Sequence, residues 1–183
     1  TATFKKLEDK MLASGGFPWF AGGTEDPYIS QHILSGIGHL NTLFPEDSLK
    51  YKTIVSKGIP NLDLKFVAQY AKKDKIIRPT TLNLNYLYTR SFYIKNYPLS
   101  QKADSLVKLQ LKQCKEDWLT YSLYDKGLLA LVMHRFNEKN FAKKIYDCRG
   151  NIADLVSEAE PPGVDWKMDA DPMEHAFRLV LGQ

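Results

Sequence analysis

The sequence predicts an all-α fold of antiparallel helical hairpins. Apolar residues recur at spacings of three and four along most of the chain, which is the period of one helix face. No stretch of the sequence alternates apolar and polar residues between turn dipeptides, as a half-buried strand would. Residues 82–94 and 128–136 are apolar on nearly all sides, whereas other segments are amphipathic. Buried inner helices with half-exposed outer ones are typical of helical solenoids and α/α toroids, and we expect part of a toroid.

The first two expected helices have recognisable boundaries. Residues 2–13 form a short amphipathic segment. Residues 26–44 form a longer one, in which Asp26 is a suitable N-cap, Pro27 fits the first helical position and Pro45 ends the helix. The buried stripe expected on this second helix is Ile29, Ile33, Ile37, Leu40 and Phe44.

The middle of the chain continues with a helical pair and a capped helix. Residues 46–57 and 62–73 form the pair, and we expect a bend or break between them at Gly58-Ile59-Pro60. Residues 80–96 follow, with a threonine N-cap at their start and Tyr97-Pro98 at their end.

A long helix capped by Ser100 is expected next, reaching about Leu123. Its apolar stripe is Val107, Leu111, Cys114, Trp118 and Tyr121. Residues 124–137 form the following helix, which is nearly all apolar from Leu128 to Met133, and this pattern predicts burial on every side.

The last third of the sequence predicts two more helices. Residues 139–158 are amphipathic, with a break expected near Gly150. Pro161-Pro162-Gly163 reads as a loop, and residues 172–181 begin a final helix capped by Asp171 ahead of Pro172.

Composition places the chain among ordinary globular proteins. It has 183 residues, 44% hydrophobic and 25% charged, with a net charge of +4 spread evenly. Its basic runs are interrupted by acidic or apolar residues, so we expect no nucleic-acid partner. No apolar run approaches the roughly 20 residues that span a bilayer, so we expect no membrane insertion of this segment. The sequence starts within a helical pattern of apolar residues and stops abruptly within another. We therefore expect residues 1–183 to be one helical domain excised from a larger multidomain protein.

The stretch GGFPWFAGG, from Gly15 to Gly23, concentrates flexible backbone and bulky side chains. The structural interpretation is a loop whose glycines allow positive φ and close backbone approach, while the three aromatics plug the end of the helical array. It predicts that Trp19 is buried. The alternative interpretation is an aromatic platform for a ligand. The residues singled out in this loop and just after it are Gly15, Gly16, Phe17, Trp19, Phe20, Gly22, Gly23 and Tyr28.

This loop and the helix after it resemble the thioester-domain region of alpha-2-macroglobulin family proteins, above all the bacterial members. Those carry a Gly-Gly-Phe-x-Trp-Phe-x-Gly-Gly loop, a short acidic or polar spacer, then Tyr-Ile-Thr-x-Tyr-Ile-Leu-x-Gly-Leu-Gly-x-Leu, and residues 28–40 here read YISQHILSGIGHL. Residues 85–92, NYLYTRSF, and 124–132, YDKGLLALV, are similar to later helices of the family. The resemblance covers most of residues 10–145.

The resemblance implies an α/α toroid and a role in a protease trap. In such proteins a bait region is cut, the body rearranges, and in many members a buried thioester acylates the attacking protease. It implies as partners the neighbouring domains of the parent protein and, through the whole protein, target proteases. It also implies a bacterial cell-envelope location, periplasmic or anchored to the outer membrane through the parent.

The thioester motif of the family is absent from this sequence. Cys114-Lys115-Glu116-Asp117 has Asp117 where the acyl-donating glutamine is required, and Cys114 falls on a buried helix stripe, so we expect a core thiol. The resemblance places the thioester upstream of Thr1. Neither Cys114 nor Cys148 has metal-ligand spacing, and a disulfide between them stays open.

His32 and His39 are weak interaction candidates on the helix after the loop. They lie seven positions apart, with no acid between them, which does not match a metal pair. We expect no metal, cofactor or catalytic residue, and we expect Gly36 and Gly38 to let a neighbouring helix approach closely.

The function expected is therefore a non-enzymatic, thioester-domain-like module of a bacterial alpha-2-macroglobulin-like protease inhibitor. One alternative is a toroidal carbohydrate-active enzyme, a glycosidase or lyase, in which Glu25 or Asp26 beside Trp19 and Phe20 would act on a sugar. The other is a helical scaffold for protein partners.

Overall fold

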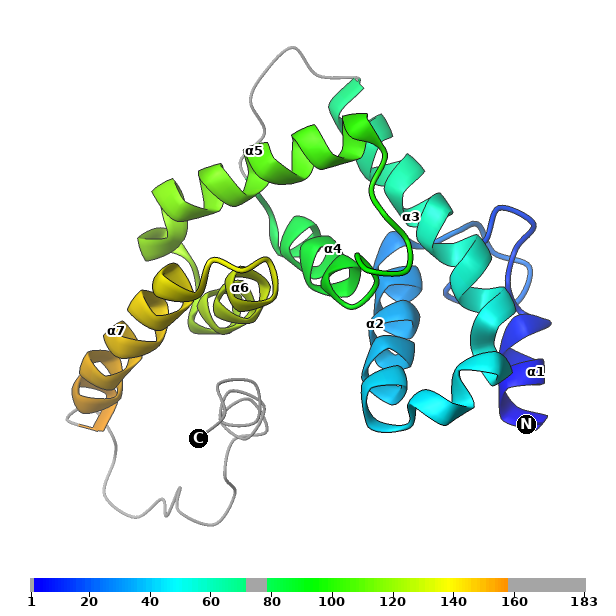
Figure 1. The fold of residues 1–183 in the computed structure, drawn as a ribbon, viewed down its shortest axis with the longest axis horizontal. Helices are drawn as coiled ribbons and strands as arrows, with labels where there is room; N and C mark the ends of the chain where they lie inside the picture. Colours follow the sequence, from blue (N-terminus) through cyan, green and yellow to red (C-terminus); the bar gives the residue numbers. More distant parts are fainter. Residues whose placement is uncertain (1, 72–78, 158–183) are drawn as a thin grey trace. The chain divides into compact units, whose positions relative to one another are not determined.

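The computed structural model describes residues 2–71 and 79–157, with side chains as far as Cys148. All regular structure in these ranges is helical, which confirms the all-α class (Figure 1). Their one β-type pairing is an isolated bridge between Pro18 and Glu25. The chain divides into two compact units, Thr1–Glu116 and Asp117–Gln183. The loop and last helix expected beyond residue 160, with the acids around Asp169, lie outside the described residues.

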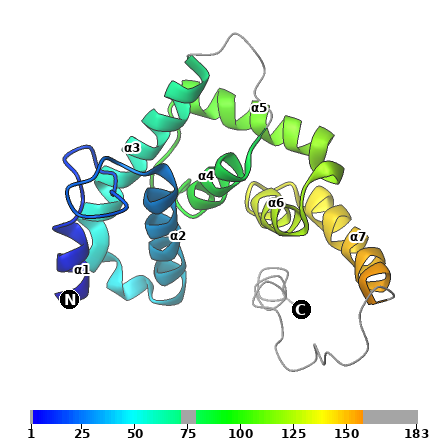
Figure 2. The same ribbon diagram turned by 180° about the vertical axis from the view of Figure 1, so that it is seen from behind.

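The first unit is built around one helix, α2. Its elements are α1 (Ala2–Glu8), α2 (Pro27–Leu43), the 3₁₀ helix η1 (Pro45–Tyr51), α3 (Lys52–Ala71), α4 (Thr81–Ser91) and α5 (Gln101–Asp117). α2 packs against η1, α3 and α4. Figures 1 and 2 show it between α4 on one side and α3 with α1 on the other.

The core of this unit lies where α2, α3 and α4 meet. Leu34 of α2, Phe66 of α3 and Leu87 of α4 are all at most 3% exposed. The rings of Phe66 and Tyr86 stack with centroids 3.9 Å apart and planes 11° apart. Aromatic and aliphatic packing of this kind supplies the main driving force for holding the three helices together.

The expected helix starts are confirmed by their hydrogen bonds. Asp26 Oδ1 accepts from the Ile29 amide at 2.9 Å, with Pro27 in the first turn. Thr80 forms a reciprocal capping box with Asn83. The Ala103 amide donates to Ser100 Oγ at 3.3 Å. These side chains satisfy amides that have no partner within the helix.

Of the bend or break expected at Gly58-Ile59-Pro60, the break is wrong, because α3 is continuous through these residues. Pro60 and Ser56, whose carbonyl loses its helical donor at Pro60, both lie on the exposed side of α3 where water can hydrate that carbonyl. Buried Ile59 and Leu62 flank the proline and anchor the helix on both sides. The break expected near Gly150 is also wrong, since α7 is helical from Lys139 to Ser157.

Three other helices end earlier than expected. α1 ends at Glu8, whereas the sequence predicts an amphipathic helix to residue 13. α4 ends at Ser91 and gives way to turns, whereas the sequence predicts helix to residue 96. α5 ends at Asp117, and Trp118–Thr120 form a separate 3₁₀ turn, η2. Trp118 nevertheless keeps its predicted buried place, 4% exposed.

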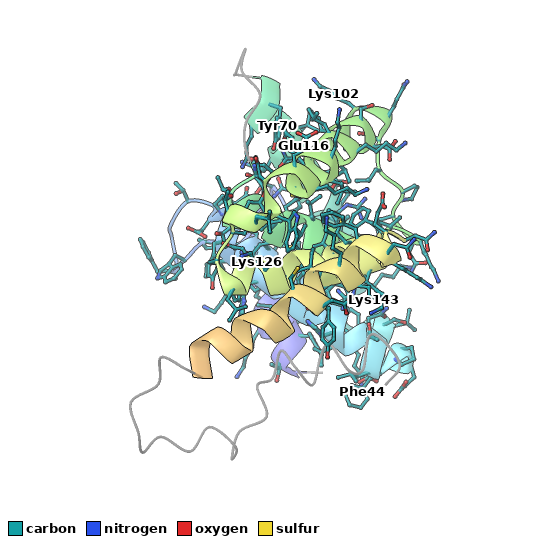
Figure 3. The ribbon with its side chains drawn as sticks, turned by 90° about the vertical axis from the view of Figure 1, so that its left-hand side faces the viewer. Phe44, Tyr70, Lys102, Glu116, Lys126 and Lys143 are labelled. Atoms are coloured by element: carbon teal, nitrogen blue, oxygen red, sulfur yellow. The ribbon has the colours of Figure 1, made fainter. Side chains whose placement is uncertain are left out.

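The buried face of α2 differs from the stripe predicted. Its buried residues are Ser30, Gln31, Leu34, Ile37 and Gly38. Leu40 is 37% exposed, and Phe44, at the end of α2 (Figure 3), is 50% exposed. Ile37 is the one residue of the predicted stripe on this buried face, and Leu34 with the small or polar Ser30, Gln31 and Gly38 takes the other positions.

In the second unit the described elements are η2, α6 (Leu123–Arg135) and α7 (Lys139–Ser157). Every residue from Leu128 to Met133 is buried, as the sequence predicts. Trp118 packs edge-on against Phe141 of α7, with centroids 6.0 Å apart. Lys143, on the solvent side of α7 (Figure 3), pairs with Asp147.

Candidate functional site

The loop of residues 15–23, called the aromatic loop below, is anchored to the start of α2 through Phe17. This side chain is 2% exposed. Its amide donates to Ser30 Oγ at 2.9 Å, and its carbonyl accepts from the Asp26 amide at 2.8 Å. The Ser30 hydroxyl in turn donates to the Asp26 carbonyl at 2.8 Å. Side-chain burial and backbone bonds therefore fix the base of the loop in one place.

Gly15 lets the loop pass close to α3. Its φ of +92° is unfavourable for residues with a side chain, and a Cβ there would lie 2.5 Å from the Lys57 carbonyl oxygen. The expectation of positive φ and close backbone approach in this loop is confirmed at this residue.

Beyond Phe17 the loop turns out into solvent. The Pro18–Glu25 bridge closes its base, and the Gly23 amide donates to the Phe20 carbonyl at 3.0 Å. Trp19 is 65% exposed and Phe20 70% exposed. The prediction that all three aromatics form a buried plug is therefore correct for Phe17 and wrong for Trp19 and Phe20. A bridge that brings residues 18 and 25 together leaves the residues between them at the tip, away from the core.

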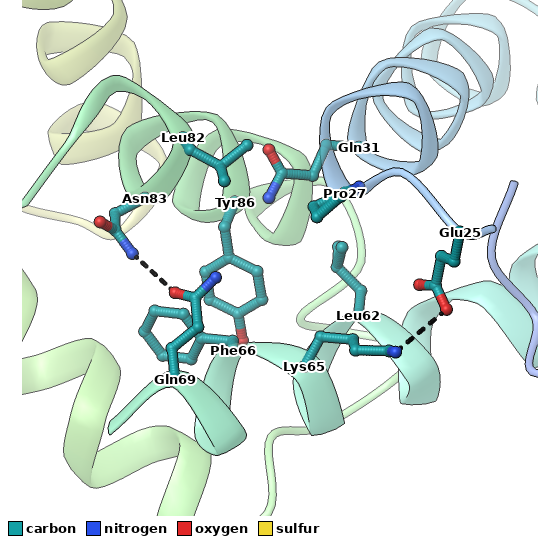
Figure 4. A pocket seen from close by; sticks show the side chains of 10 residues that line it. All are labelled: Glu25, Pro27, Gln31, Leu62, Lys65, Phe66, Gln69, Leu82, Asn83 and Tyr86. Atoms are coloured by element: carbon teal, nitrogen blue, oxygen red, sulfur yellow. Dashed lines mark hydrogen bonds and ion pairs between the residues drawn. The ribbon is translucent and has the colours of Figure 1, made fainter. Parts of the chain in front are cut away.

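Glu25 ties the loop to α3. Its Oε1 accepts from Asn61 Nδ2 at 2.6 Å, and its Oε2 accepts from Ser14 Oγ at 3.1 Å. Lys65 Nζ lies 3.3 Å from the same Oε2 (Figure 4), and the Glu25 side chain is 11% exposed. Glu25 thus holds the loop in place with both oxygens, while Asp26 caps α2. This use of the two carboxylates favours a structural role over acid–base chemistry on a sugar.

His32 and His39 each join an aromatic group rather than each other. The His32 ring stacks on Tyr28, with centroids 6.0 Å and planes 16° apart. His39 Nε2 lies 2.7 Å from the Tyr88 hydroxyl, and its ring meets Phe92 edge-on at 4.8 Å. Within the described residues no three histidine, cysteine or acidic side chains are placed to hold a metal ion.

The solvent face of α2 carries no formal charge. Its 17 residues include no Asp, Glu, Lys or Arg. Tyr28, His32, Gly36, His39 and Leu43 are all exposed along it. Gly38 faces inward, where a Cβ would lie 2.5 Å from the Phe92 ring, whereas a Cβ on Gly36 would meet nothing within 4 Å. Close approach of a neighbour is therefore confirmed for Gly38 and wrong for Gly36 within the described residues.

A buried ion pair between α3 and α4 was not singled out from the sequence. Arg90 is fully buried, and its Nε lies 2.8 Å from Asp63 Oδ1. The Tyr86 hydroxyl donates to the same oxygen at 2.8 Å, and Arg90 Nη2 donates to the Tyr97 carbonyl at 2.7 Å. Burial raises the pKa of Asp63 above its ordinary value, although the Arg90 charge and the Tyr86 hydroxyl act against this rise. Arg90 stands in the segment YLYTRS, but Asp63 is too distant in sequence to be paired with it by spacing.

The two cysteines differ in burial. Cys114 is fully buried, which confirms the core thiol expected from its stripe. Cys148 is partly exposed. No helix of the described residues is both long enough and apolar enough to cross a membrane.

Comparison with known proteins found no similar protein or structure. No family model matches the chain, and no match was found among curated proteins or solved structures.

Proposed function

We propose that this chain is a non-enzymatic, thioester-domain-like module of a bacterial alpha-2-macroglobulin-like protease-trapping protein. Its helices would form part of an α/α toroid of antiparallel hairpins. Its partners would be the neighbouring domains of the parent protein and, through the whole protein, target proteases. The parent would act in the bacterial cell envelope, in the periplasm or anchored to the outer membrane.

The observation that carries this proposal is the construction of the aromatic loop. The motif through which the sequence resembles the family is the same segment that buries Phe17 and exposes Trp19 and Phe20. Large apolar side chains on a loop with a fixed base lose little conformational freedom on binding, and they are enriched where proteins contact one another. An exposed Trp–Phe pair held in this way suits a contact between domains.

The charges beside the loop support a binding role over a catalytic one. Glu25 uses both carboxylate oxygens to fasten the loop to Ser14, Asn61 and Lys65. Asp26 uses one oxygen to cap α2. A glycosidase needs two carboxyl groups free to face the same bond, so the carbohydrate-active alternative finds less support here. A helical scaffold for other protein partners would use the same exposed pair.

The proposal is tested on the full-length parent protein mixed with an endopeptidase. A trapped protease keeps its activity on small peptides, because its active site stays open, but loses activity on large protein substrates. We expect the parent to show this difference. Equal cleavage of both substrates in the presence of excess parent protein would contradict the proposal.

The role of the loop is tested separately with Trp19→Ser/Phe20→Ser in the same parent. Both residues are exposed, so we expect an unchanged circular dichroism spectrum and melting temperature together with weaker trapping. Lys143→Ser/Lys144→Ser on exposed positions of α7 is the control and should trap as the wild type does. Glycan cleavage by the wild-type chain that is abolished in Glu25→Gln would favour the carbohydrate-active alternative.

A further inference from the structure

A small pocket lies beside the loop anchor, where α2, α3 and α4 meet (Figure 4). Its polar lining comes from all three helices and from the loop. The residues that line it are Glu25, Pro27, Gln31, Leu62, Lys65, Phe66, Gln69, Leu82, Asn83 and Tyr86.

Gln31 brings an unsatisfied polar group to this pocket. The residue is 6% exposed, and its Oε1 has no hydrogen-bond partner among residues 2–71 and 79–148. Figure 4 shows its amide extending from α2 toward Leu82 and Tyr86 of α4. A buried amide oxygen without a partner is costly, so buried polar groups are nearly always bonded to protein or to ordered water. Exchanging the oxygen and nitrogen of the amide would leave a buried donor instead, which water also satisfies.

The volume of the pocket and the charges that line it limit which molecules can bind there. Its volume is about 20 Å³, above the about 10–15 Å³ that a single water needs and too small for a larger solute. The Lys65 ammonium lines the pocket and pairs with Glu25, so no unpaired negative charge is left on these two side chains to balance a metal cation. A neutral molecule that both donates and accepts hydrogen bonds fits the lining.

We propose that this pocket binds one ordered water molecule, which donates a hydrogen bond to Gln31 and joins α2 to polar groups of α3 and α4. Gln69 and Asn83 supply the facing polar groups. They already bond each other, with Asn83 Nδ2 3.3 Å from Gln69 Oε1, so the water extends an existing link between α3 and α4 to α2. The site lies next to Glu25, and it therefore steadies the base of the aromatic loop as well as the helices.

The direct test is a crystal structure of the chain at about 1.8 Å resolution or better. We expect electron density for one water within about 2.7–3.2 Å of the Gln31 amide. A pocket without such density, or a protein group from elsewhere in the chain bonded to the Gln31 oxygen, would overturn the proposal.

A second test in solution counts long-lived buried waters by ¹⁷O magnetic relaxation dispersion. Gln31→Met keeps the side-chain length and removes the amide, so we expect one long-lived water fewer than in the wild type and a lower melting temperature. Gln101→Met, the same exchange at an exposed position of α5, should keep the wild-type count. An unchanged count in Gln31→Met would show that the amide holds no long-lived water. Circular dichroism confirms that each variant is folded, and the crystal structure of the wild type decides the matter if Gln31→Met is not.

Discussion

At the scale of single residues, Phe17 and Trp19 show how one short motif divides its side chains between core and solvent. Phe17 is 2% exposed and Trp19 65% exposed, although both are large aromatics two positions apart. We predict that Phe17→Ala lowers the free energy of unfolding by about 3–5 kcal/mol, as for other buried aromatics. Trp19→Ala should change it by at most about 0.5–1 kcal/mol, because the side chain buries little surface. Urea titration followed by circular dichroism measures both values.

Phe20→Ala serves as a control for this pair, since Phe20 is 70% exposed and should behave as Trp19 does. A loss for Trp19→Ala as large as that for Phe17→Ala would mean that the tip of the loop is packed against other parts of the chain in solution.

Asp63 makes the free energy of unfolding depend on pH, and the direction of this dependence follows from its pKa. Burial holds the pKa of its carboxyl above the ordinary value of 3.8 in the folded protein. Between that value and the raised pKa, the folded state keeps a proton that the unfolded state has lost, so the contribution of Asp63 to stability falls as pH rises through this window. Above the raised pKa the contribution is constant. Subtracting the unfolding free energies of Asp63→Asn from those of the wild type, over a pH series from 3 to 8, isolates it.

The subtraction works because Arg90 stays charged over the whole range, so its loss of a partner in Asp63→Asn adds a constant offset. We expect the difference to decline with rising pH and then level off. A difference that grows with pH would mean that the ion pair with Arg90 outweighs burial and holds the pKa of Asp63 below its ordinary value.

At the scale of elements, α2 contrasts two glycines on opposite faces. A Cβ on Gly38 would lie 2.5 Å from the Phe92 ring, whereas a Cβ on Gly36 would meet nothing within 4 Å. We predict that Gly36→Ala raises the free energy of unfolding by about 0.5–1 kcal/mol, the helix propensity that alanine adds. Gly38→Ala gains the same propensity but must displace Phe92, and overpacking of this kind typically costs about 1–3 kcal/mol, so the net change should be a loss.

Thermal unfolding of the two variants beside the wild type gives the comparison. The double variant Gly38→Ala/Phe92→Leu is the matched control, because a smaller flexible side chain at residue 92 should relieve part of the loss. Equal stabilisation by both alanines would contradict the packing of α4 against α2 described here.

The helices were predictable where local chemistry decides them. The caps at Asp26, Thr80 and Ser100 depend on side chains that bond amides three positions away, and sequence displays such spacing directly. The break predicted at Pro60 was wrong because a proline interrupts a helix less when the carbonyl that it leaves without a donor can be hydrated. Whether that side of the helix is exposed to solvent depends on the tertiary structure. The buried face of α2 was also misjudged, since the apolar residues Leu40 and Phe44 lie on its exposed side.

The candidate site was predictable in its position and only in part in its arrangement. Periodicity and glycine spacing indicated the loop of residues 15–23, and Gly15 has the positive φ expected there. The exposure of Trp19 and Phe20 follows from the pairing of Pro18 with Glu25 and from the bonds of Glu25 to Asn61 and Lys65 on α3. Such contacts join residues as many as 40 positions apart and leave no local pattern.

At the scale of the whole molecule, the chain forms two compact units that divide at Glu116 and Asp117. Each has its own buried residues, with Phe17, Leu34 and Leu87 in the first and Leu129, Val132 and Met133 in the second. Units with separate cores are able to unfold separately, so local stability should differ between them. We predict that Phe17→Ala speeds hydrogen exchange in peptides from α2, α3 and α4 and leaves the exchange of α6 at the wild-type rate.

Hydrogen exchange measured by mass spectrometry resolves the two sets of peptides in one experiment. The reciprocal variant Leu129→Ala removes a fully buried side chain from α6 and should speed exchange there while leaving α2 unchanged. The two variants together separate independent unfolding from a merely less stable second unit, because each should act only on its own unit. Equal acceleration in both units by either variant would show that they unfold as one body, and the aromatic loop would then report on the whole chain rather than on the first unit alone.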